Sequence, residues 1–264
     1  MIIDGRAIAQ DIAARAKARA GRLEHPPLVV AIIGQETPAT LSYLKIKKER
    51  AIDAGCIFET RPLGSDFKEA DSVIVQLPLP DGIHQKDICD SIPLGKDADV
   101  LSTAARAAFE QGTPDAVLPP VVGAIREILT RTRINLPGKQ VAVIGEGWLV
   151  GNPAALWFTQ QGAHVTVVTK ETKNLSSVLA NADIIVSGAG QPGLITPSMI
   201  KDGVVLIDAG TSESGGAIAG DVDPACASKC SVFTPVPGGV GPIAVAYLFQ
   251  NAVTLAENID RKTF

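Results

Sequence analysis

The sequence predicts an α/β fold in which helices cover mainly parallel sheets. Two observations support this prediction. Aromatic residues make up only 4% of the chain, and the apolar residues are mostly Ala, Val, Ile and Leu, a composition typical of strands buried on both faces. A strand, a glycine-bearing turn, a helix and a second strand also follow one another over residues 140–168. With 264 residues, the chain suits one large or two modest domains.

The first part of the chain alternates between helical and strand-like patterns. Helices are expected over residues 6–23 and 37–54, and strands over 28–33, 56–61 and 72–77. Pro38 suits the first turn of the second helix and Gly55 its end. Only about ten residues (62–71) join the second and third strands, whereas a parallel crossover usually needs a dozen or more. Either this connection is cramped, or the second strand occupies an unusual place.

The second part of the chain predicts a doubly wound, Rossmann-like domain. Pro119-Pro120 marks a boundary, and a helix is expected after it over residues 123–132. The further expected elements are strands at 140–144, 163–168, 184–186 and 204–207, a helix at 153–161, and a closing apolar helix at 243–259. We therefore predict a smaller α/β domain of residues 1–118 plus 243–264, a dinucleotide domain of residues 119–242, and a cleft between them.

Composition and charge argue against several classes of partner. The net charge is −4, and the charges are dispersed without a basic block, so no nucleic-acid partner is expected. Asp4 and Arg6 stand where a signal peptide would need apolar residues, and no apolar run reaches the ~18–20 residues of a membrane span. The 4 cysteines form no zinc pattern with the 3 histidines. We expect reduced thiols, no metal site and a cytoplasmic location.

A glycine turn, residues 145–151, follows a predicted strand and opens a predicted helix. Such a turn lets backbone amides and the helix N-terminus face a phosphate group. The spacing of Gly145, Gly147 and Gly151 is not that of the standard dinucleotide fingerprint. Taken alone, the turn indicates either a phosphate site or an ordinary tight connection between strand and helix.

Tyr43 and Lys47 are four residues apart on a predicted helix, so both side chains project from one face. Lys45, Lys48 and Arg50 surround Lys47. Like charges and burial in a cleft would lower the pKa of Lys47 and make it suitable for carrying a proton. The alternative is a solvated basic helix face.

Three further segments have patterns suited to lining a ligand site. Gln76 stands between an apolar strand and the double-proline turn Leu77-Pro78-Leu79-Pro80. Lys96-Asp97-Ala98-Asp99 is a charged loop, which by itself would indicate an exposed surface. The segment 234–242 is rich in proline and glycine, a composition that favours a ligand-lining loop over a plain linker.

Taken together, these segments resemble one family across nearly the whole chain: the bifunctional methylenetetrahydrofolate dehydrogenase/methenyltetrahydrofolate cyclohydrolases. The Gln76 to Pro80 string and the Pro235 to Pro242 string are the most specific. The other matching segments, in the family's order, are Ile3-Asp4-Gly5-Arg6, Tyr43 with Lys47, Lys96-Asp97-Ala98-Asp99, Gly145 with Val150-Gly151-Asn152-Pro153, Ala182-Asp183-Ile184-Ile185-Val186, and Gly220-Asp221-Val222-Asp223.

The resemblance implies a role for each folate-side residue. Lys47 would be the catalytic lysine, Tyr43 would pack on and position the folate, and Gln76 would hydrogen-bond Lys47. Asp99 would bind the pterin ring, and Pro237, Gly238 and Gly239 would line the cleft. The cofactor-binding residues implied in the same way are Gly145, Glu146, Gly147, Val150, Gly151, Lys170 and Gly190. The resemblance also suggests a homodimer formed through the dinucleotide domain.

The sequence departs from the family pattern mainly on the cofactor side. The family's arginine for the 2′-phosphate of NADP is replaced by Glu146, and its serine after the next strand is replaced by Lys170. Either Lys170 takes the phosphate of NADP, or Glu146 holds a ribose hydroxyl and the cofactor is NAD. A glycine usual in the acidic loop is Val100. The family's Pro-Cys-Thr-Pro at the domain junction reads Pro119-Pro120-Val121-Val122, which loses a threonine hydroxyl near the cofactor cleft, and a threonine expected shortly after the proline- and glycine-rich loop is Ala244.

These changes leave rival functions open. The chain could perform the cyclohydrolase step alone, with an eroded dinucleotide site. It could also bind folate or nucleotide without catalysis. A different Rossmann dehydrogenase, such as one acting on shikimate, fits poorly with the Gln76 to Pro80 string and the pairing of Tyr43 with Lys47.

Overall fold

The computed structural model describes residues 1–214 and 217–263, and the chain forms two compact units. One unit contains Ala9–Pro120 and Val245–Phe264 and is called the three-stranded unit here, after its sheet. The other contains Met1–Ile8 and Val121–Ala244 and is called the five-stranded unit. The α/β class with parallel sheets, predicted from the sequence, is confirmed.

The three-stranded unit is built on a parallel sheet in the order β2-β1-β3. Its strands are β1 (Leu28–Ile33), β2 (Ile57–Pro62) and β3 (Ser72–Gln76), and its helices include α2 (Pro38–Asp53), α3 (Gln85–Asp90), the short 3-10 helix η1 (Leu94–Lys96) and α4 (Thr103–Gln111). β1 lies between β2 and β3, so the chain from β2 to β3 passes across β1 without a helix. The second strand therefore lies at an edge of the sheet, and the connection that follows it is short because it contains no helix.

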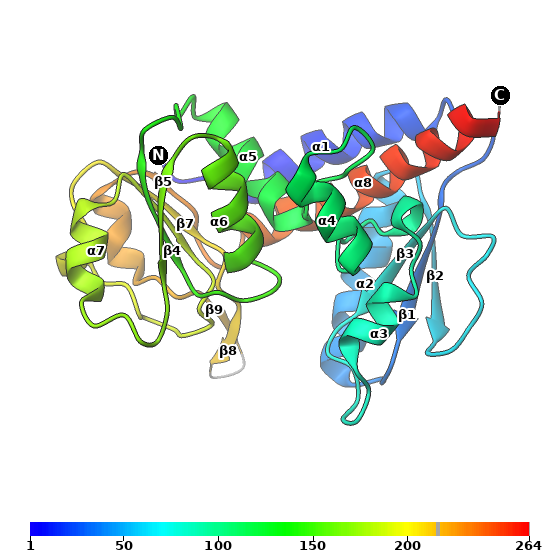
Figure 1. The fold of residues 1–264 in the computed structure, drawn as a ribbon, viewed down its shortest axis with the longest axis horizontal. Coiled ribbons are helices and arrows are strands. Elements are labelled where there is room, and N and C mark those ends of the chain that lie inside the picture. Colours follow the sequence, from blue (N-terminus) through cyan, green and yellow to red (C-terminus); the bar gives the residue numbers. More distant parts are fainter. Residues whose placement is uncertain (215–216, 264) are drawn as a thin grey trace. The chain divides into compact units, whose positions relative to one another are not determined.

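Helices α1 (Gly5–Ala20) and α8 (Val240–Thr263) run side by side (Figure 1). Ala16 and Ala20 of α1 share a buried core with Phe249 of α8 and with β1. The ring of Phe58 on β2 meets that of Phe249 edge-on, with the two ring centroids 6.1 Å apart. The C-terminal helix therefore contributes to the core of the three-stranded unit.

The five-stranded unit has a wholly parallel sheet in the order β10-β7-β6-β4-β5. These strands are β4 (Gln140–Ile144), β5 (His164–Val168), β6 (Ile184–Ser187), β7 (Val204–Asp208) and β10 (Cys230–Phe233). Helix α6 (Gly151–Gln160) lies on one side of the sheet and α7 (Leu175–Asn181) on the other (Figure 1). Its remaining elements are helix α5 (Pro120–Arg131), the 3-10 helices η2 (Pro197–Met199) and η3 (Pro224–Ser228), and an antiparallel hairpin of β8 (Ser212–Ser214) and β9 (Ala217–Ala219).

The first residues of the chain extend this second sheet. The amide of Ile3 donates to the carbonyl of Phe233, and the amide of Phe233 donates to the carbonyl of Met1, both at 2.9 Å. Residues 1–8 therefore pack with the five-stranded unit, whereas the sequence predicts them in the smaller domain of residues 1–118 plus 243–264. Backbone pairing to an open sheet edge leaves little trace in side-chain patterns, so the sequence could not indicate it.

Candidate active site

The amine of Lys47 and the side-chain amide of Gln76 meet in the three-stranded unit. Lys47 lies on α2, whose start is capped by Thr37, the hydroxyl of which accepts a 3.1 Å hydrogen bond from the amide of Thr40. Gln76 is the last residue of β3 and is 7% exposed. Lys47 Nζ donates to Gln76 Oε1 at 2.8 Å, and Gln76 Nε2 donates to the carbonyl of Leu77 at 2.8 Å. The second bond holds the amide with its oxygen toward the lysine.

Burial shifts the proton affinities of Lys47 and Asp99 in opposite directions. The pKa of Lys47 is lowered, chiefly by burial, and the Asp99 carboxylate opposes this by favouring the charged amine. Burial raises the pKa of Asp99 to about 6, although the Lys47 charge works against the rise. Each group therefore favours its neutral form more than it does in water. An amine that gives up its proton readily is suited to general acid–base catalysis.

The loop that carries Asp99 is held from within the three-stranded unit. Asp97 is 1% exposed, and its Oδ2 accepts hydrogen bonds from the amides of Leu101 at 3.0 Å and Ser102 at 2.7 Å. Asn251 of α8 donates from Nδ2 to the carbonyls of Ala98 at 2.9 Å and Leu118 at 2.8 Å. These bonds set the backbone on both sides of Asp99.

Val100 follows directly in the left-handed backbone region, with φ of 57°. This conformation favours glycine and is strained for a β-branched residue. The family that the sequence resembles usually has a glycine here, and this backbone conformation explains why. Tyr43, predicted to pack on the substrate, is 47% exposed on α2.

The predicted cofactor turn follows the end of β4 in the five-stranded unit. Gly145 has φ of 90°, in the left-handed region. A Cβ on Gly151 would lie 1.9 Å from the carbonyl oxygen of Gly145, so only glycine fits at the start of α6. Glu146 and Gly147 are exposed, and nothing lies within 4 Å of a Cβ built on Gly147. The turn therefore leaves backbone open beside the N-terminus of a helix, as the phosphates of a dinucleotide require.

Two other predicted cofactor residues belong to this unit. Lys170 is exposed just after β5, the strand that pairs with β4. Gly190 follows β6 with φ of 67°, and its carbonyl accepts a 2.8 Å hydrogen bond from the hydroxyl of Ser212. Both residues therefore follow the carboxyl ends of parallel strands, the edge at which ligands bind in doubly wound sheets.

The proline- and glycine-rich loop lies after β10 in the five-stranded unit. Gly238 has φ of 105°, and its carbonyl accepts a 2.9 Å hydrogen bond from the amide of Gly5. A Cβ on Gly5 would lie 1.9 Å from the carbonyl oxygen of Gly239. Pro237, Gly238 and Gly239 thus belong to a different unit from Lys47, Gln76 and Asp99.

Sequence reasoning assigned no role to Ser187, Asp208, Asp221 and Asn251, all of which are buried. Asp221 stands in one of the strings that resemble the family, and the strand that the sequence predicts over 204–207 ends just before Asp208. A carboxylate placed directly after an apolar strand run was the signal available for Asp208. Apart from Gly210, which bonds Asp208 from two residues away, the partners named below lie far away in the sequence, so these contacts could not be inferred from it.

The chain matches two family models whose combined extent covers most of its length. One is described as the tetrahydrofolate dehydrogenase/cyclohydrolase catalytic domain and matches residues 3–99. The other is described as the NAD(P)-binding domain of the same enzymes and matches residues 119–260. The chain belongs to the tetrahydrofolate dehydrogenase/cyclohydrolase family. The family predicted from the sequence is thus confirmed, and so is the coarser cofactor prediction of a nicotinamide dinucleotide.

Curated relatives and solved structures agree with this assignment. The bifunctional protein FolD of Thermotoga petrophila is 34% identical over 97% of this chain and 98% of its own, and that of Lactobacillus acidophilus is 36% identical over 96% of each. The bifunctional FolD structure from Campylobacter jejuni has a TM-score of 0.93 at 30% identity, covering 98% of this chain and 99% of its own. The FolD structure from Trypanosoma brucei, described as complexed with NADP cofactor and inhibitor, has a TM-score of 0.91 at 30% identity, covering 99% and 98%.

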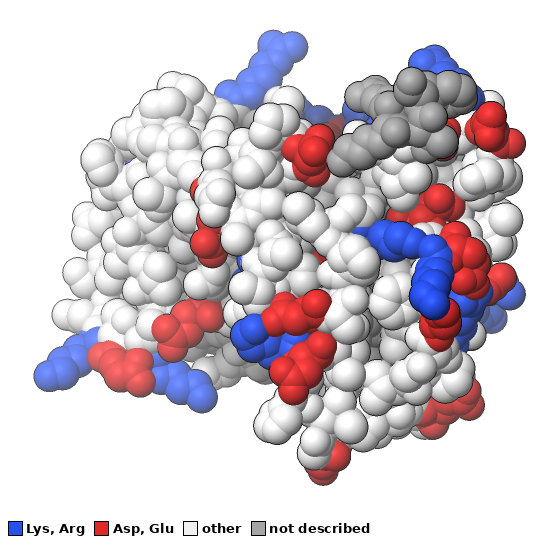
Figure 2. Space-filling view, turned by 45° about the vertical axis from the view of Figure 1, so that its right-hand side comes forward, with Lys and Arg blue, Asp and Glu red and all other residues white. Residues whose placement is uncertain are grey.

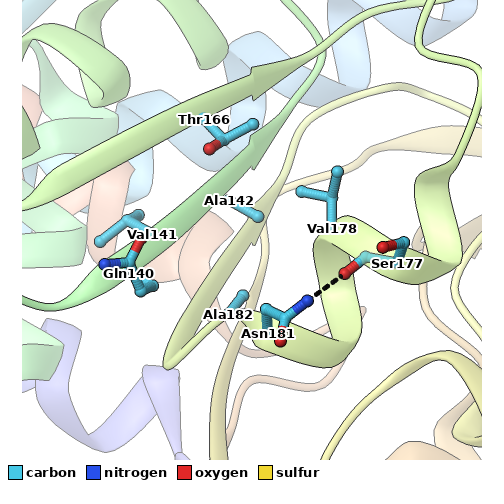
Figure 3. Close-up of a pocket in the computed structure, with 8 residues that line it drawn as sticks. All are labelled: Gln140, Val141, Ala142, Thr166, Ser177, Val178, Asn181 and Ala182. Carbon is cyan, nitrogen blue, oxygen red and sulfur yellow. Dashed lines mark hydrogen bonds between the residues drawn. The ribbon is translucent and has the colours of Figure 1, made fainter.

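A pocket elsewhere in the five-stranded unit is separate from these residues. Its volume is about 220 Å³, and its lining includes Gln140, Thr166, Ser177 and Asn181 (Figure 3). The Asn181 side chain bonds the carbonyl of Ser177 across one turn of α7 at 2.8 Å. Gln140 begins β4, whereas the glycine turn follows the end of that strand. The pocket is therefore not the predicted cofactor site.

No metal site is visible in the described part of the chain, where no three His, Cys, Asp or Glu side chains gather in a way that could hold an ion. Over the same residues, no helix has both the length and the apolar character needed to cross a membrane.

Proposed function

We propose that this protein oxidises 5,10-methylenetetrahydrofolate to 5,10-methenyltetrahydrofolate with NAD(P), and hydrolyses that product to 10-formyltetrahydrofolate. The observation that carries the proposal is the half-buried Lys47 amine, hydrogen-bonded to Gln76 and with a lowered pKa, in a chain of this family. A dinucleotide, when bound, accepts the hydride that leaves the one-carbon bridge. The lysine is suited to the hydrolytic step, which moves protons and needs no dinucleotide.

Hydrolysis of the methenyl cation releases one proton overall, because two protons leave the attacking water and one is delivered to the leaving nitrogen. Water adds to the bridging carbon and loses its first proton; the ring then opens as the bond from carbon to the leaving nitrogen breaks, the nitrogen gains a proton, and the hydroxyl loses its proton to solvent as the formyl C=O forms. Neutral Lys47 can accept the first proton and return it to the nitrogen, which makes it general base and then general acid. Gln76 keeps the amine in place, Asp99 would hold the pterin ring, and Tyr43 would pack against the folate.

We propose NADP as the cofactor, with Lys170 as the residue that meets its 2′-phosphate. The exposed ammonium of Lys170 follows β5, next to the strand that leads into the glycine turn. The Trypanosoma brucei relative described with NADP supports the same choice. Glu146 argues for NAD, because its carboxylate would repel a phosphate and could instead accept a hydrogen bond from a ribose hydroxyl. Lys170→Ala should weaken NADP binding and leave NAD binding unchanged, whereas equal effects on both would assign Lys170 no role at the phosphate.

The decisive experiment measures methenyltetrahydrofolate formation from methylenetetrahydrofolate with NADP and with NAD in parallel. Turnover with either dinucleotide is expected, and the more effective one identifies the cofactor. Lys47→Met should abolish hydrolysis of methenyltetrahydrofolate while leaving the fold intact; retained hydrolysis would remove Lys47 from the mechanism. Folded wild-type protein without dehydrogenase turnover, but with hydrolysis, would favour a cyclohydrolase alone. Binding of ligands without either reaction would favour a non-catalytic binding protein.

We propose that the protein is a homodimer joined through β5 of the five-stranded unit. β5 is an edge strand, its Val167 side chain is 42% exposed, and the pocket drawn in Figure 3 opens beside Thr166 on the same strand. An unpaired edge that carries apolar side chains is a surface on which a second copy can pair. Val167→Lys should convert the dimer to a monomer in sedimentation analysis. Ile57→Lys is a matched control, because Ile57 is 48% exposed on β2, an edge strand of the other sheet.

Charge and cysteine state support the remaining proposals on partners and location. On the face drawn in Figure 2, acidic and basic side chains are interspersed without a continuous basic surface, which favours small folate substrates over nucleic acid. The four cysteines are free thiols, and three of them are buried, as suits a reducing cytoplasm.

A further inference from the structure

Two buried carboxylates lie beneath the cofactor edge of the five-stranded unit. Asp208 is the last residue of β7 and is 2% exposed, and Asp221 is fully buried just before η3. Asp208 Oδ1 accepts hydrogen bonds from the amides of Gly210 at 2.9 Å and Asp221 at 3.3 Å, and its Oδ2 accepts one from the amide of Val222 at 3.1 Å. Asp208 therefore fixes the backbone that carries Asp221.

Asp221 in turn binds the segment that follows β6. Its Oδ2 accepts from the hydroxyl of Ser187 at 2.6 Å and from the amide of Ala189 at 2.8 Å, and its Oδ1 accepts from the amide of Gln191 at 2.7 Å. Ser187 is the buried last residue of β6, whereas Ala189 and Gln191 are exposed. One carboxylate thus holds an exposed loop from its inner side.

Two glycines make room for this pair of carboxylates. A Cβ on Gly210 would lie 2.3 Å from the carboxyl carbon of Asp221, and a Cβ on Gly220 would lie 2.1 Å from Oδ2 of Asp208. Each acid therefore packs directly against backbone that has no side chain.

The segment held by Asp221 packs directly on the predicted cofactor turn. A Cβ on Gly188 would lie 2.5 Å from Cγ1 of Val150, and a Cβ on Gly145 would lie 2.9 Å from the carbonyl oxygen of Gly188. β6 pairs with β4, so the turn after β4 and the segment after β6 are neighbours at the carboxyl edge of the sheet. A displaced segment 187–191 would therefore carry the glycine turn with it.

We propose that Asp221 is a positioning residue for dinucleotide binding, acting by holding residues 187–191 against the glycine turn 145–151. The proposal rests on the proposed function, because it assumes that a nicotinamide dinucleotide binds at this edge. The carboxylate does not touch the cofactor. It sets the backbone that the cofactor meets, so that this backbone is ordered before the ligand arrives. Both NADP and NAD depend on it, because the segment lies on the part of the site common to the two.

The test compares Asp221→Asn with a matched control, Asp183→Asn. Asparagine has nearly the same shape as aspartate, but an amide nitrogen, which cannot accept a hydrogen bond, replaces one of the two carboxylate oxygens. The variant therefore loses either the acceptor for Ser187 and Ala189 or the acceptor for Gln191. Asp183 belongs to the same sheet and accepts bonds from the amide of Gln140 at 3.0 Å and from Lys201 Nζ at 2.7 Å, but it lies where β4 and β6 begin. Both variants lose charge-assisted hydrogen bonds, and only one loses them at the cofactor edge.

Titration calorimetry with NADP and with NAD measures the affinity, and dinucleotide-independent hydrolysis of methenyltetrahydrofolate measures the folate-side function. Asp221→Asn should raise the Kd for both dinucleotides by about tenfold or more, the usual cost of losing bonds to a buried charged acceptor. The hydrolysis rate should stay unchanged. Asp183→Asn should lower the thermal midpoint without changing either Kd.

Ser187→Ala keeps the Asp221 charge and removes one of its donors, so it carries the test if Asp221→Asn fails to fold. A weaker loss of dinucleotide affinity with unchanged hydrolysis is expected. Unchanged affinity in folded Asp221→Asn, or an equal loss in Asp183→Asn, would overturn the proposal. Wild-type protein that binds neither dinucleotide would instead overturn the dehydrogenase function, and this inference with it.

Discussion

At the scale of single residues, the proposed proton transfer depends on what surrounds the Lys47 amine. Burial lowers its pKa, the nearby Asp99 carboxylate opposes that effect, and Gln76 accepts a hydrogen bond from it. Gln76 accepts without adding charge, so it orients the amine and leaves the charge balance to Asp99. Of these two side chains, Asp99 is therefore the one whose charge shifts the pH range in which Lys47 is neutral.

Asp99→Asn should shift the acid limb of the hydrolysis pH profile to lower pH. The Asp99 carboxylate raises the pKa of Lys47, so its removal should lower that pKa further and keep the neutral amine present at more acidic pH. The quantity to measure is the pH at which kcat/KM for hydrolysis falls on the acid side. The size of kcat/KM is not a suitable measure, because it should also fall if Asp99 binds the pterin. Asp53→Asn, at an exposed ion pair with Arg50 at the end of α2, should leave the limb where it is. A limb unmoved in Asp99→Asn would mean that Lys47 does not set it.

At the scale of elements, the N-terminal segment holds the proline- and glycine-rich loop through Gly5. Gly5→Ala should destabilise the protein by about 1–3 kcal/mol, because its Cβ would clash with the backbone of Gly238 and Gly239, and no side-chain rotation can relieve a clash with backbone. Urea unfolding measures this cost. Gly21→Ala is the control, since the nearest atom to its Cβ would be the carbonyl oxygen of Lys17 at an ordinary 3.5 Å. Equal stability of the two variants would show that the loop does not need Gly5.

Helix α8 is expected to hold the acidic loop through Asn251. Asn251→Leu keeps the apolar part of the contact and removes the donor to the carbonyls of Ala98 and Leu118. Because two carbonyls would lose this donor, the free energy of unfolding should fall by about 1–3 kcal/mol. The KM for the folate should rise, because Asp99 adjoins Ala98. Unfolding measurements and steady-state kinetics test the two effects separately. A stability loss with an unchanged KM would limit Asn251 to a structural role.

At the scale of the whole molecule, buried acids should make the stability depend on pH. Burial raises the pKa of Asp99 and of Asp208 to about 6 from 3.8, so the folded protein binds more protons than the unfolded chain between those values. The contribution of these acids to the free energy of unfolding is therefore fully present below about pH 3.8 and is lost as the pH rises toward 6. For one such group the change is on the order of 3 kcal/mol.

Asp208→Asn should reduce this pH dependence, because it removes one of the two titrating groups. Denaturation midpoints of the wild type and the variant across that pH range provide the measurement. The wild type should lose more stability than the variant as the pH rises. Parallel curves would show that Asp208 does not titrate there. Asp90, whose pKa is lowered to about 2 by Lys86 and Thr103, works in the opposite sense at more acidic pH, because its contribution is lost as the pH falls.

Local patterns predicted most of the regular elements. β1 and β4 have the predicted limits, 28–33 and 140–144, because short runs of branched aliphatics bounded by turns identify buried parallel strands. Helix α2 begins at Pro38 and ends at Asp53, shortly before Gly55, as the proline and the glycine at its two ends indicate. The hairpin of β8 and β9 and the strand β10 were not predicted, because three or four residues with mixed polarity leave too weak a pattern.

The sequence by itself determined the α/β class, the family and which residues could perform proton transfer, because each depends on local periodicity or on residues adjacent in the chain. Only the tertiary structure decided that Met1 to Ile3 join the second sheet, and that Asp208 and Asp221 hold the backbone that follows β7 and β6. These contacts join residues that are distant in the sequence, and their bonds are made largely by backbone groups that every residue carries. A single sequence cannot distinguish one backbone amide from another; only the packed chain selects the partners.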